Sequence, residues 1–235
     1  FYNMMYRKGT NEFIDAMFQC NNNQLVVNNP ELSDIPSTGA FIVVSNHPFG
    51  GWDGVALIKT LAAKRPAIRP YPRHYVERAQ LANGTSITLR PIRPEDETLM
   101  VQFHKDLSDN SVRSWYFESR SLDERIDHTR LRRSCFIDYA NEMALIALVD
   151  QPDGTKAIAG IARLQKSSYA SRARFAIGVT DKWQKQGIGS LLLAKLVDIA
   201  KTEGLTLLRA AFLAESANLK HLFEKFGFRI VNASP

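Results

Sequence analysis

The hydrophobic pattern of residues 1–66 predicts a helix, a buried strand and a second helix. Residues 12–19 show a weak helical pattern, and residues 40–45 (AFIVVS) form an apolar run rich in β-branched side chains, which is typical of a buried strand. Residues 53–63 (DGVALIKTLAA) predict a helix with Asp53 near its N-terminus. Because two helices and one strand bury little surface, we expect this part not to be stable alone.

The pattern changes further along the chain, where short apolar strands are interspersed with helices. Residues 188–202 give the clearest helix, because aliphatic side chains recur along it at helical spacing. The other predicted helices are 97–107, 122–133 and 217–226, and the predicted strands are 85–91, 142–149, 157–165, 172–180, 206–213 and a short one from Phe228. This order predicts an α+β fold with a mixed, mostly antiparallel sheet flanked by helices, preceded by a small partial α/β segment.

Prolines mark the boundary between the two patterns. Residues 64–73 (KRPAIRPYPR) contain three prolines and four basic residues. Proline cannot continue a helix and favours an extended path. We therefore expect a segment at 1–66, a linker at 67–78 and a domain at 79–235.

The composition is that of a globular protein. Hydrophobic residues make up 45% and charged residues 23% of the 235 residues, which excludes a chain that is disordered throughout. Cys20 and Cys135 are the only cysteines, and neither a secretory signal nor an apolar run of about 20 residues is visible. We therefore expect a cytoplasmic protein without a transmembrane segment. None of the five histidines has a metal-ligand spacing, so no metal is predicted.

The net charge of +6 is unevenly distributed. Residues 1–66 contain five basic and five acidic residues, so the whole excess falls on residues 67–235. A basic domain suggests an anionic partner, and a solvated basic surface explains the same charge. We find no interleaving of aromatic and basic residues typical of nucleic-acid binding, so no nucleic-acid partner is predicted.

A glycine-containing segment joins a predicted strand to the longest predicted helix. Residues 177–190 read IGVTDKWQKQGIGS. The first amides of a helix lack intrahelical acceptors and carry partial positive charge, so they can bind a phosphate or pyrophosphate. Gly187 and Gly189 would allow such a group to approach closely. Two glycines are also compatible with a tight turn alone.

Residues 184–189 (QKQGIG) match the Gln/Arg-x-x-Gly-x-Gly/Ala signature of the GNAT superfamily of N-acetyltransferases, which the chain resembles over about residues 79–232. The late segment from Asn218 to Phe228 is similar to the closing stretch of that superfamily. The opening ITLRPIRPEDE resembles more narrowly the protein lysine acetyltransferases. The loop fits neither a dinucleotide fingerprint nor a Walker loop.

This resemblance implies acetyl-CoA, or another short acyl-CoA, as the donor and an amine, such as a protein lysine, as the acceptor. The pyrophosphate would bind the backbone of residues 184–190, and the pantetheine arm would pair with the strand end at 177–180. The backbone near Val179 would polarise the thioester carbonyl, and Asn218 would lie near the thiol. The implied cofactor-binding residues are Val179, Gln184, Lys185, Gly187, Ile188, Gly189, Ser190 and Asn218.

The general base is less evident than the donor site, because a lysine ammonium must lose a proton before it attacks. In the lysine acetyltransferases that the chain resembles, a Glu lies in the strand before the glycine loop. Arg174 stands there in this chain, and a guanidinium stays protonated. Glu215 is our first candidate replacement, Glu142 the second, and Asp181 flanks the cofactor strand; each is otherwise a solvated charge at a strand end. Phe223 stands where many members carry a Tyr acid.

A second candidate site follows the predicted strand at 40–45. His47 and Asp53 can act as a base and the group that orients it, or simply lie in a turn. The stretch DIPSTGAFIVVSNHPFGGWDGVAL resembles the start of hemolysin-type and glycerolipid acyltransferases, whose later blocks are missing here. Residues 1–66 are therefore predicted to be a truncated segment. The alternatives to an N-acetyltransferase are a lipid O-acyltransferase using His47 and Asp53, with membrane-surface contact, and a non-catalytic acyl-CoA-binding module.

Overall fold

The structure is a computed structural model. It describes residues 51–64, 71–167 and 171–231 and, nearer the N-terminus, residues 14, 15, 18, 19, 22, 24–27, 34, 35 and 43. The chain divides into two compact units, Phe1–Pro70 and Tyr71–Pro235. Each unit is described by itself below.

The first unit contains helix α3 (Gly51–Lys64), which confirms the helix predicted at 53–63. The Lys59 ammonium lies 2.8 Å from the Asp15 carboxylate and 4.8 Å from the centre of the Phe18 ring. The described residues of the helix predicted at 12–19 are helical. Of the strand predicted at 40–45 only Val43 is described, and it lies outside regular secondary structure.

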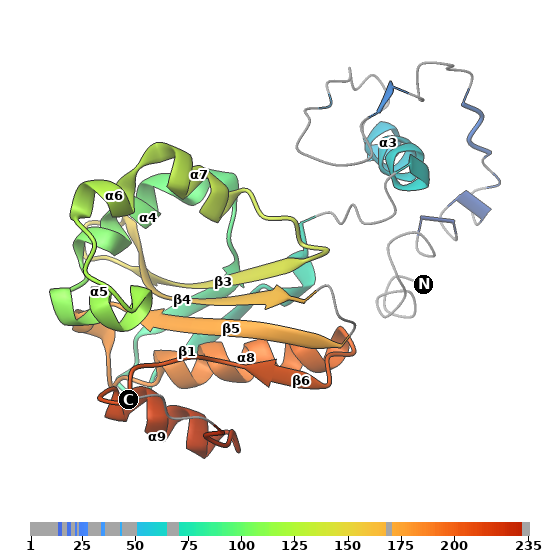
Figure 1. Cartoon of the computed structure of the whole chain (residues 1–235). Coiled ribbons are helices and arrows are strands. Elements are labelled where there is room, and N and C mark those ends of the chain that lie inside the picture. Colours follow the sequence, from blue (N-terminus) through green and yellow to red (C-terminus); the bar gives the residue numbers. More distant parts are fainter. Residues whose placement is uncertain are drawn as a thin grey trace. The chain divides into compact units, whose positions relative to one another are not determined.

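The second unit is built on a six-stranded sheet in the order β1-β2-β3-β4-β5-β6 (Figure 1). Neighbouring strands are antiparallel except β5 and β6, which are parallel. This arrangement confirms the predicted mixed, mostly antiparallel sheet. The strands are β1 (Glu77–Gln80), β2 (Ser86–Pro91), β3 (Glu142–Asp150), β4 (Lys156–Lys166), β5 (Arg172–Val179) and β6 (Leu207–Arg209).

Helices cover both faces of the sheet, because its inner strands are apolar on both sides. One buried cluster joins Leu145, Leu164 and Phe175 to α8 (Ile188–Thr202) and α9 (Ala217–Lys225). The other joins alternate residues of β3 and β4 to the remaining helices. These are α4 (Glu97–Lys105), α5 (Asp109–Tyr116), α6 (Leu122–Ile126) and α7 (His128–Cys135), with short 3-10 turns at Arg73–Tyr75, Pro94–Asp96 and Asp181–Trp183.

The predicted helix at 122–133 is two helices, α6 and α7. Asp127 separates them, and its carboxylate accepts a hydrogen bond from the Arg130 amide (2.9 Å) at the start of α7. Helix α5 was not predicted; the Ser108 hydroxyl caps its N-terminus by accepting from the Ser111 amide (3.3 Å). Short polar side chains thus break this region into turns that the hydrophobic pattern does not reveal.

The stretch assigned to a linker, 67–78, is in part integral to the second unit. Tyr75 is buried against the sheet, and the Tyr71 hydroxyl donates to the Pro91 carbonyl (2.9 Å). Strand β1 begins at Glu77 and pairs with β2. From residue 71 onward the chain therefore packs on the sheet, because the contacts of its tyrosines fix it there despite the neighbouring prolines.

Strands β5 and β6 pair only at one end and then diverge. Residues 172–174 lie opposite 207–209, and the edge of β5 beyond Arg174 has no described strand beside it. The strand predicted at 206–213 is therefore shorter, and the described residues 228–231 form no strand. Phe223 of α9 belongs to the same core cluster as α8, with ring centres 5.4 Å from both Phe175 and Phe212. The candidate site is built on the open edge of β5 beyond Arg174.

Candidate functional site

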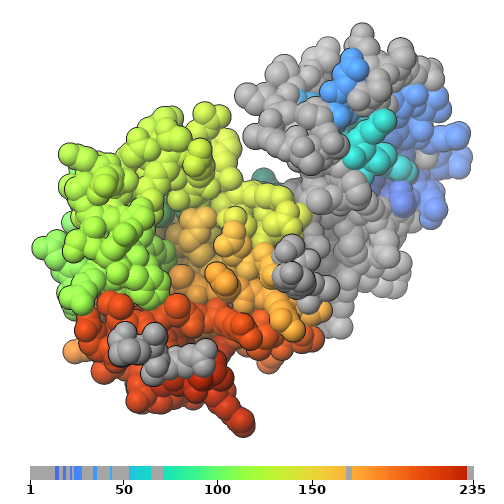
Figure 2. Space-filling view, viewed as in Figure 1, coloured from blue at the N-terminus to red at the C-terminus, as the bar shows by residue number. Residues whose placement is uncertain are grey.

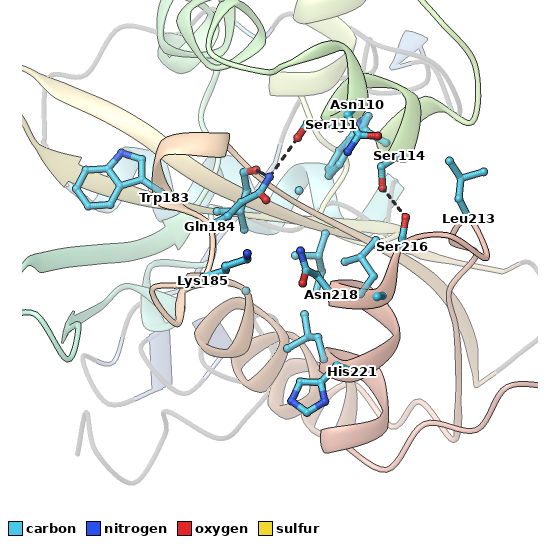
Figure 3. Close-up of a pocket in the computed structure, with 18 of the residues that line it drawn as sticks. Asn110, Ser111, Ser114, Trp183, Gln184, Lys185, Leu213, Ser216, Asn218 and His221 are labelled. Atoms are coloured by element: carbon cyan, nitrogen blue, oxygen red, sulfur yellow. Dashed lines mark hydrogen bonds between the residues drawn. The ribbon is translucent and has the colours of Figure 1, made fainter.

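A cleft of about 510 Å³ lies beside the open end of β5. Its walls are the end of β5, the loop that follows, the start of α8, helix α5 and the segment from Leu213 into α9. Figure 3 shows Lys185 on the loop and Asn218 on α9 facing each other across the opening. The structure thus brings most of the predicted cofactor-binding residues to one cavity.

Strand β5 offers main-chain hydrogen-bonding groups to this cleft. The Thr180 amide donates to the Ala159 carbonyl of β4 (2.9 Å). Because alternate residues of an antiparallel strand bond to the same neighbour, the main-chain groups of Val179 and Ile177 point to the opposite edge, where the cleft lies. The Val179 carbonyl is occupied by the Gln184 side chain (3.1 Å), which leaves the Val179 amide facing the cavity.

Gln184 fixes the glycine loop in place. Its amide nitrogen donates both to the Val179 carbonyl and to the Ser111 hydroxyl on α5, each at 3.1 Å. Lys185 (φ 60°) and Gly187 (φ 94°) adopt left-handed conformations, so the loop turns sharply before the helix. Only glycine adopts this conformation without strain.

The turn aims the start of α8 at the cleft. The first bond within the helix runs from the Leu191 amide to the Gly187 carbonyl (3.0 Å), so the amides of residues 188–190 precede any intrahelical acceptor. Gly187, Gly189 and Ser190 line the cavity. Ile188 differs, because its side chain is 1% exposed and belongs to the core. Only the main-chain amide of Ile188 can therefore contact a ligand in the cleft.

Two glycines allow close packing around the cleft. A Cβ atom on Gly189 would lie 3.3 Å from Leu222 and 3.9 Å from Val179, so a side chain there would narrow the cavity. A Cβ atom on Gly178 would lie 2.3 Å from the Trp115 ring, which covers this part of β5. The need for Gly178 was not evident from the sequence.

Glu215 is the only carboxylate among the described residues that line the cleft. Its side chain is 61% exposed and lies 3.4 Å from the Arg113 guanidinium of α5. Next to this ion pair, the hydroxyls of Ser114 and Ser216 are hydrogen-bonded at 3.2 Å, as Figure 3 shows. The two pairs connect α5 to the segment before α9.

Glu142 lies far from this cavity. It begins β3, opposite Gln165 of β4, which in turn lies opposite Arg174 of β5. Val179 is five residues further along β5 than Arg174, or about 16 Å at the rise of a strand. Glu142 also makes a 3.5 Å ion pair with Arg163. The structure therefore does not bring the second base candidate to the cleft.

Asp181 links the loop after β5 to helix α5 through hydrogen bonds. Its carboxylate accepts hydrogen bonds from the Ser108 amide (2.8 Å), the Ser108 hydroxyl (2.8 Å) and the Ser111 hydroxyl (2.9 Å). Partial burial acts to raise its pKa, but these hydrogen bonds outweigh the burial and lower the pKa below its usual value. Asp181 thus anchors α5 against the loop and is a poor proton acceptor.

Several cleft residues carry no sequence motif and were missed. They come from α5 and from α9. The SDNS sequence at 108–111, a helix-capping pattern, was the one available signal for α5. These residues are Asn110, Ser111, Ser114, Trp115 and His221.

The alternative acyltransferase pair receives no support from the structure. Asp53 lies in the first turn of α3, and His47 lies outside the described residues. Within the described part of the chain, no three His, Cys, Asp or Glu side chains are grouped to hold a metal ion. None of the helices in that part combines the length and the hydropathy that a bilayer span needs.

Comparison with known proteins identifies the fold. A family model described as an acetyltransferase (GNAT) domain matches residues 86–229. The chain is 27% identical over 155 residues to acetyltransferase PA5475 of Pseudomonas aeruginosa, covering 66% of this chain and 80% of that protein. The GNAT domain of S. lividans PAT superposes with a TM-score of 0.60 at 23% identity, covering 68% of this chain and 91% of that one.

A further solved structure, PaiA N-acetyltransferase from Thermoplasma acidophilum in complex with coenzyme A, has a TM-score of 0.50 at 15% identity and covers 63% of this chain and 92% of its own. The cleft beside a diverging strand and the glycine loop that opens a helix define an acyl-CoA-dependent transferase. The chain belongs to the GNAT family of acetyltransferases.

Proposed function

We propose that the protein transfers an acetyl group from acetyl-CoA to the side-chain amine of a protein lysine. The observation that carries this proposal is the convergence of three features on one cleft. These are the unbonded amides at the start of α8, the free edge of β5 at Val179, and the cavity of about 510 Å³ that both of them line.

The start of α8 suits a diphosphate. The amides of Ile188, Gly189 and Ser190 supply donors and partial positive charge, and Lys185 adds a full charge at the same wall. The glycines keep this wall free of bulk. Acetyl-CoA would supply an activated thioester, and the protein would bind the cofactor and hold the thioester in one orientation.

The Val179 amide, which faces the cavity, is our candidate donor to the thioester oxygen, on which negative charge develops when an amine attacks the carbonyl carbon. The attacking amine must first be neutral. Glu215 is our candidate to accept its proton, directly or through a water molecule, after its carboxylate separates from Arg113. Asn218 faces the same opening and is our candidate to contact the departing thiol.

The test uses the full chain and measures acetyl-CoA binding by calorimetry and acetyl transfer to a panel of lysine peptides and small amines. Gly189→Val should weaken acetyl-CoA binding at least tenfold, because the new side chain fills space between Leu222 and Val179. Gly187→Val is less informative, since its positive φ would strain any β-branched residue.

Ala194→Val is the matched control, because it adds the same kind of bulk to an exposed position of α8. It should leave binding unchanged. Unchanged affinity of the Gly189→Val protein would refute the loop assignment. Saturable acetyl-CoA binding without transfer to any amine would refute the enzymatic function and favour a non-catalytic module.

A further inference from the structure

Strand β5 carries an unusual row of charges on the face opposite to its core side chains. Ala173, Phe175 and Ile177 are buried against α8, whereas Arg172 and Arg174 on the other face are exposed. In the sheet register, Arg174 lies directly beside Arg209 of β6. The floor of the sheet at this end is therefore an arginine surface, formed by Arg172, Arg174 and Arg209.

No described residue compensates this surface. The carboxylate nearest in register is Glu142, two strands away from β5, and it pairs with Arg163. The side chains of the three arginines make no ion pair or hydrogen bond with the described part of the chain. Like charges directly opposite each other on adjacent strands are destabilising. The fold therefore tolerates Arg174 beside Arg209 at a cost, which a bound anion would remove.

The arginine surface is continuous with the catalytic end of β5. Arg174 and Gly178 lie on the same face, because they are four residues apart on one strand, or about 13 Å. Gly178 lines the cleft. Figure 2 shows the orange strands of this face as the floor of a hollow between the green α5–α7 helices and the red C-terminal segment. A ligand lying in this hollow would extend from the arginines to the cleft.

We propose that the acceptor is a lysine in an acidic stretch of a polypeptide, whose carboxylates bind the arginine surface while the lysine enters the cleft. This rests on the proposed function. An extended peptide advances about 3.3–3.6 Å per residue, so acidic residues two to four positions from the lysine reach the arginines. Guanidinium groups bind carboxylates through paired hydrogen bonds, which gives direction as well as charge. Arg174 and its neighbours would thus help to select the acceptor.

The experiment compares kcat/KM of the full chain for three peptides with one lysine each, flanked by Glu, Gln or Lys at positions two to four residues away. We expect the acidic peptide to be preferred over the neutral one about tenfold, as two or three exposed ion pairs would give. High salt should reduce this preference. Arg172→Gln, Arg174→Gln and Arg209→Gln together should abolish it, and replacing the same three arginines by Glu should reverse it in favour of the basic peptide.

Arg78→Gln is the matched control, because Arg78 is an exposed arginine of β1, at the other edge of the same sheet. It should leave the preference intact. Acetyl-CoA affinity of every variant is measured in parallel and should be unchanged. Equal rates on all three peptides would overturn the inference and leave the proposed function standing. Faster transfer to the small amines of the panel above than to any of the three peptides would overturn the polypeptide acceptor. Absence of transfer to every acceptor would refute the proposed function itself.

Discussion

At its end near Val179, strand β5 presents main-chain polar groups to the cleft, whereas at its end near Arg172 it presents charged side chains. The first end is enclosed by Trp115 and Gln184, and the second is an open, positively charged floor. Main-chain donors suit a chemical group that is the same in every reaction cycle, such as the diphosphate or the thioester of the donor, and they do not depend on which side chains the strand carries. Charged side chains can be exchanged without changing the fold. Under the proposed function, one strand would therefore serve donor binding at one end and acceptor selection at the other.

Glu215→Gln should give the largest effect and should act on chemistry alone. If Glu215 accepts the proton of the attacking amine, kcat/KM at pH 7 should fall about 100-fold. The factor should be equal for acidic and neutral peptides, unlike the effect of replacing Arg174. The difference should narrow as pH approaches the lysine pKa of about 10.4, where the amine loses its proton unaided.

The measurement is a pH profile of kcat/KM at saturating acetyl-CoA. Glu224→Gln, at an exposed position of α9 outside the cleft lining, serves as the control and should behave like the parent. Full activity of Glu215→Gln at pH 7 would remove Glu215 from the mechanism. A loss of activity with acidic peptides alone would show that Glu215 affects acceptor selection, and would contradict the separate roles of the two ends of β5.

Gly178→Ala should give the next effect, on stability. The added Cβ atom would overlap the Trp115 ring, which must move, so we expect a loss of about 1–3 kcal/mol in the free energy of unfolding. Ala176→Val, two residues earlier on the same face, adds bulk in the exposed region and should cost far less. The check is denaturant unfolding with Trp115→Leu as the partner mutation. Strict additivity of the two substitutions would contradict the overlap.

Asp181→Asn should give the smallest effect, and one that depends on pH. The pKa of Asp181 is lower in the folded protein than in the unfolded chain, so its stabilising contribution is present above the unfolded value of 3.8 and is lost as pH falls through the folded value. Because the carboxylate is largely exposed, we expect less than about 1 kcal/mol at pH 7. Urea unfolding at pH 7 and pH 3 should show the difference between parent and variant shrinking at the lower pH. A constant difference would exclude the charge as its cause.

Much of the donor site could be predicted because its determinants are local. A helix begins at Ile188 because aliphatic residues recur at helical spacing, and Gly187 precedes it because the chain must adopt a positive φ there. Both facts can be read within one short segment. The loop residues that line the cleft could therefore be predicted from the sequence. Ile188 is the exception, because its side chain lies in the core and only its main-chain amide faces the site.

The opposite wall could not be predicted, because it is formed by residues distant in the sequence. Ser111 is 73 residues from Gln184, to which its hydroxyl is bonded. Trp115 lies over Gly178 only after α5 has packed on the sheet. Glu142 and Glu215 both stand at strand ends in the sequence, and only the strand order separates them.

The sequence alone determined the mixed α+β sheet and the helix that starts at the glycine loop, since these depend on periodicity and on a short contiguous segment. The acyl-CoA-dependent class followed from the resemblance of that segment to the GNAT signature. Only the tertiary structure decided which side chains share the cleft and which face of β5 carries the arginines beside Arg209. The physical reason is that a strand's neighbours are set by the register of the whole sheet, which depends on contacts between residues far apart along the chain.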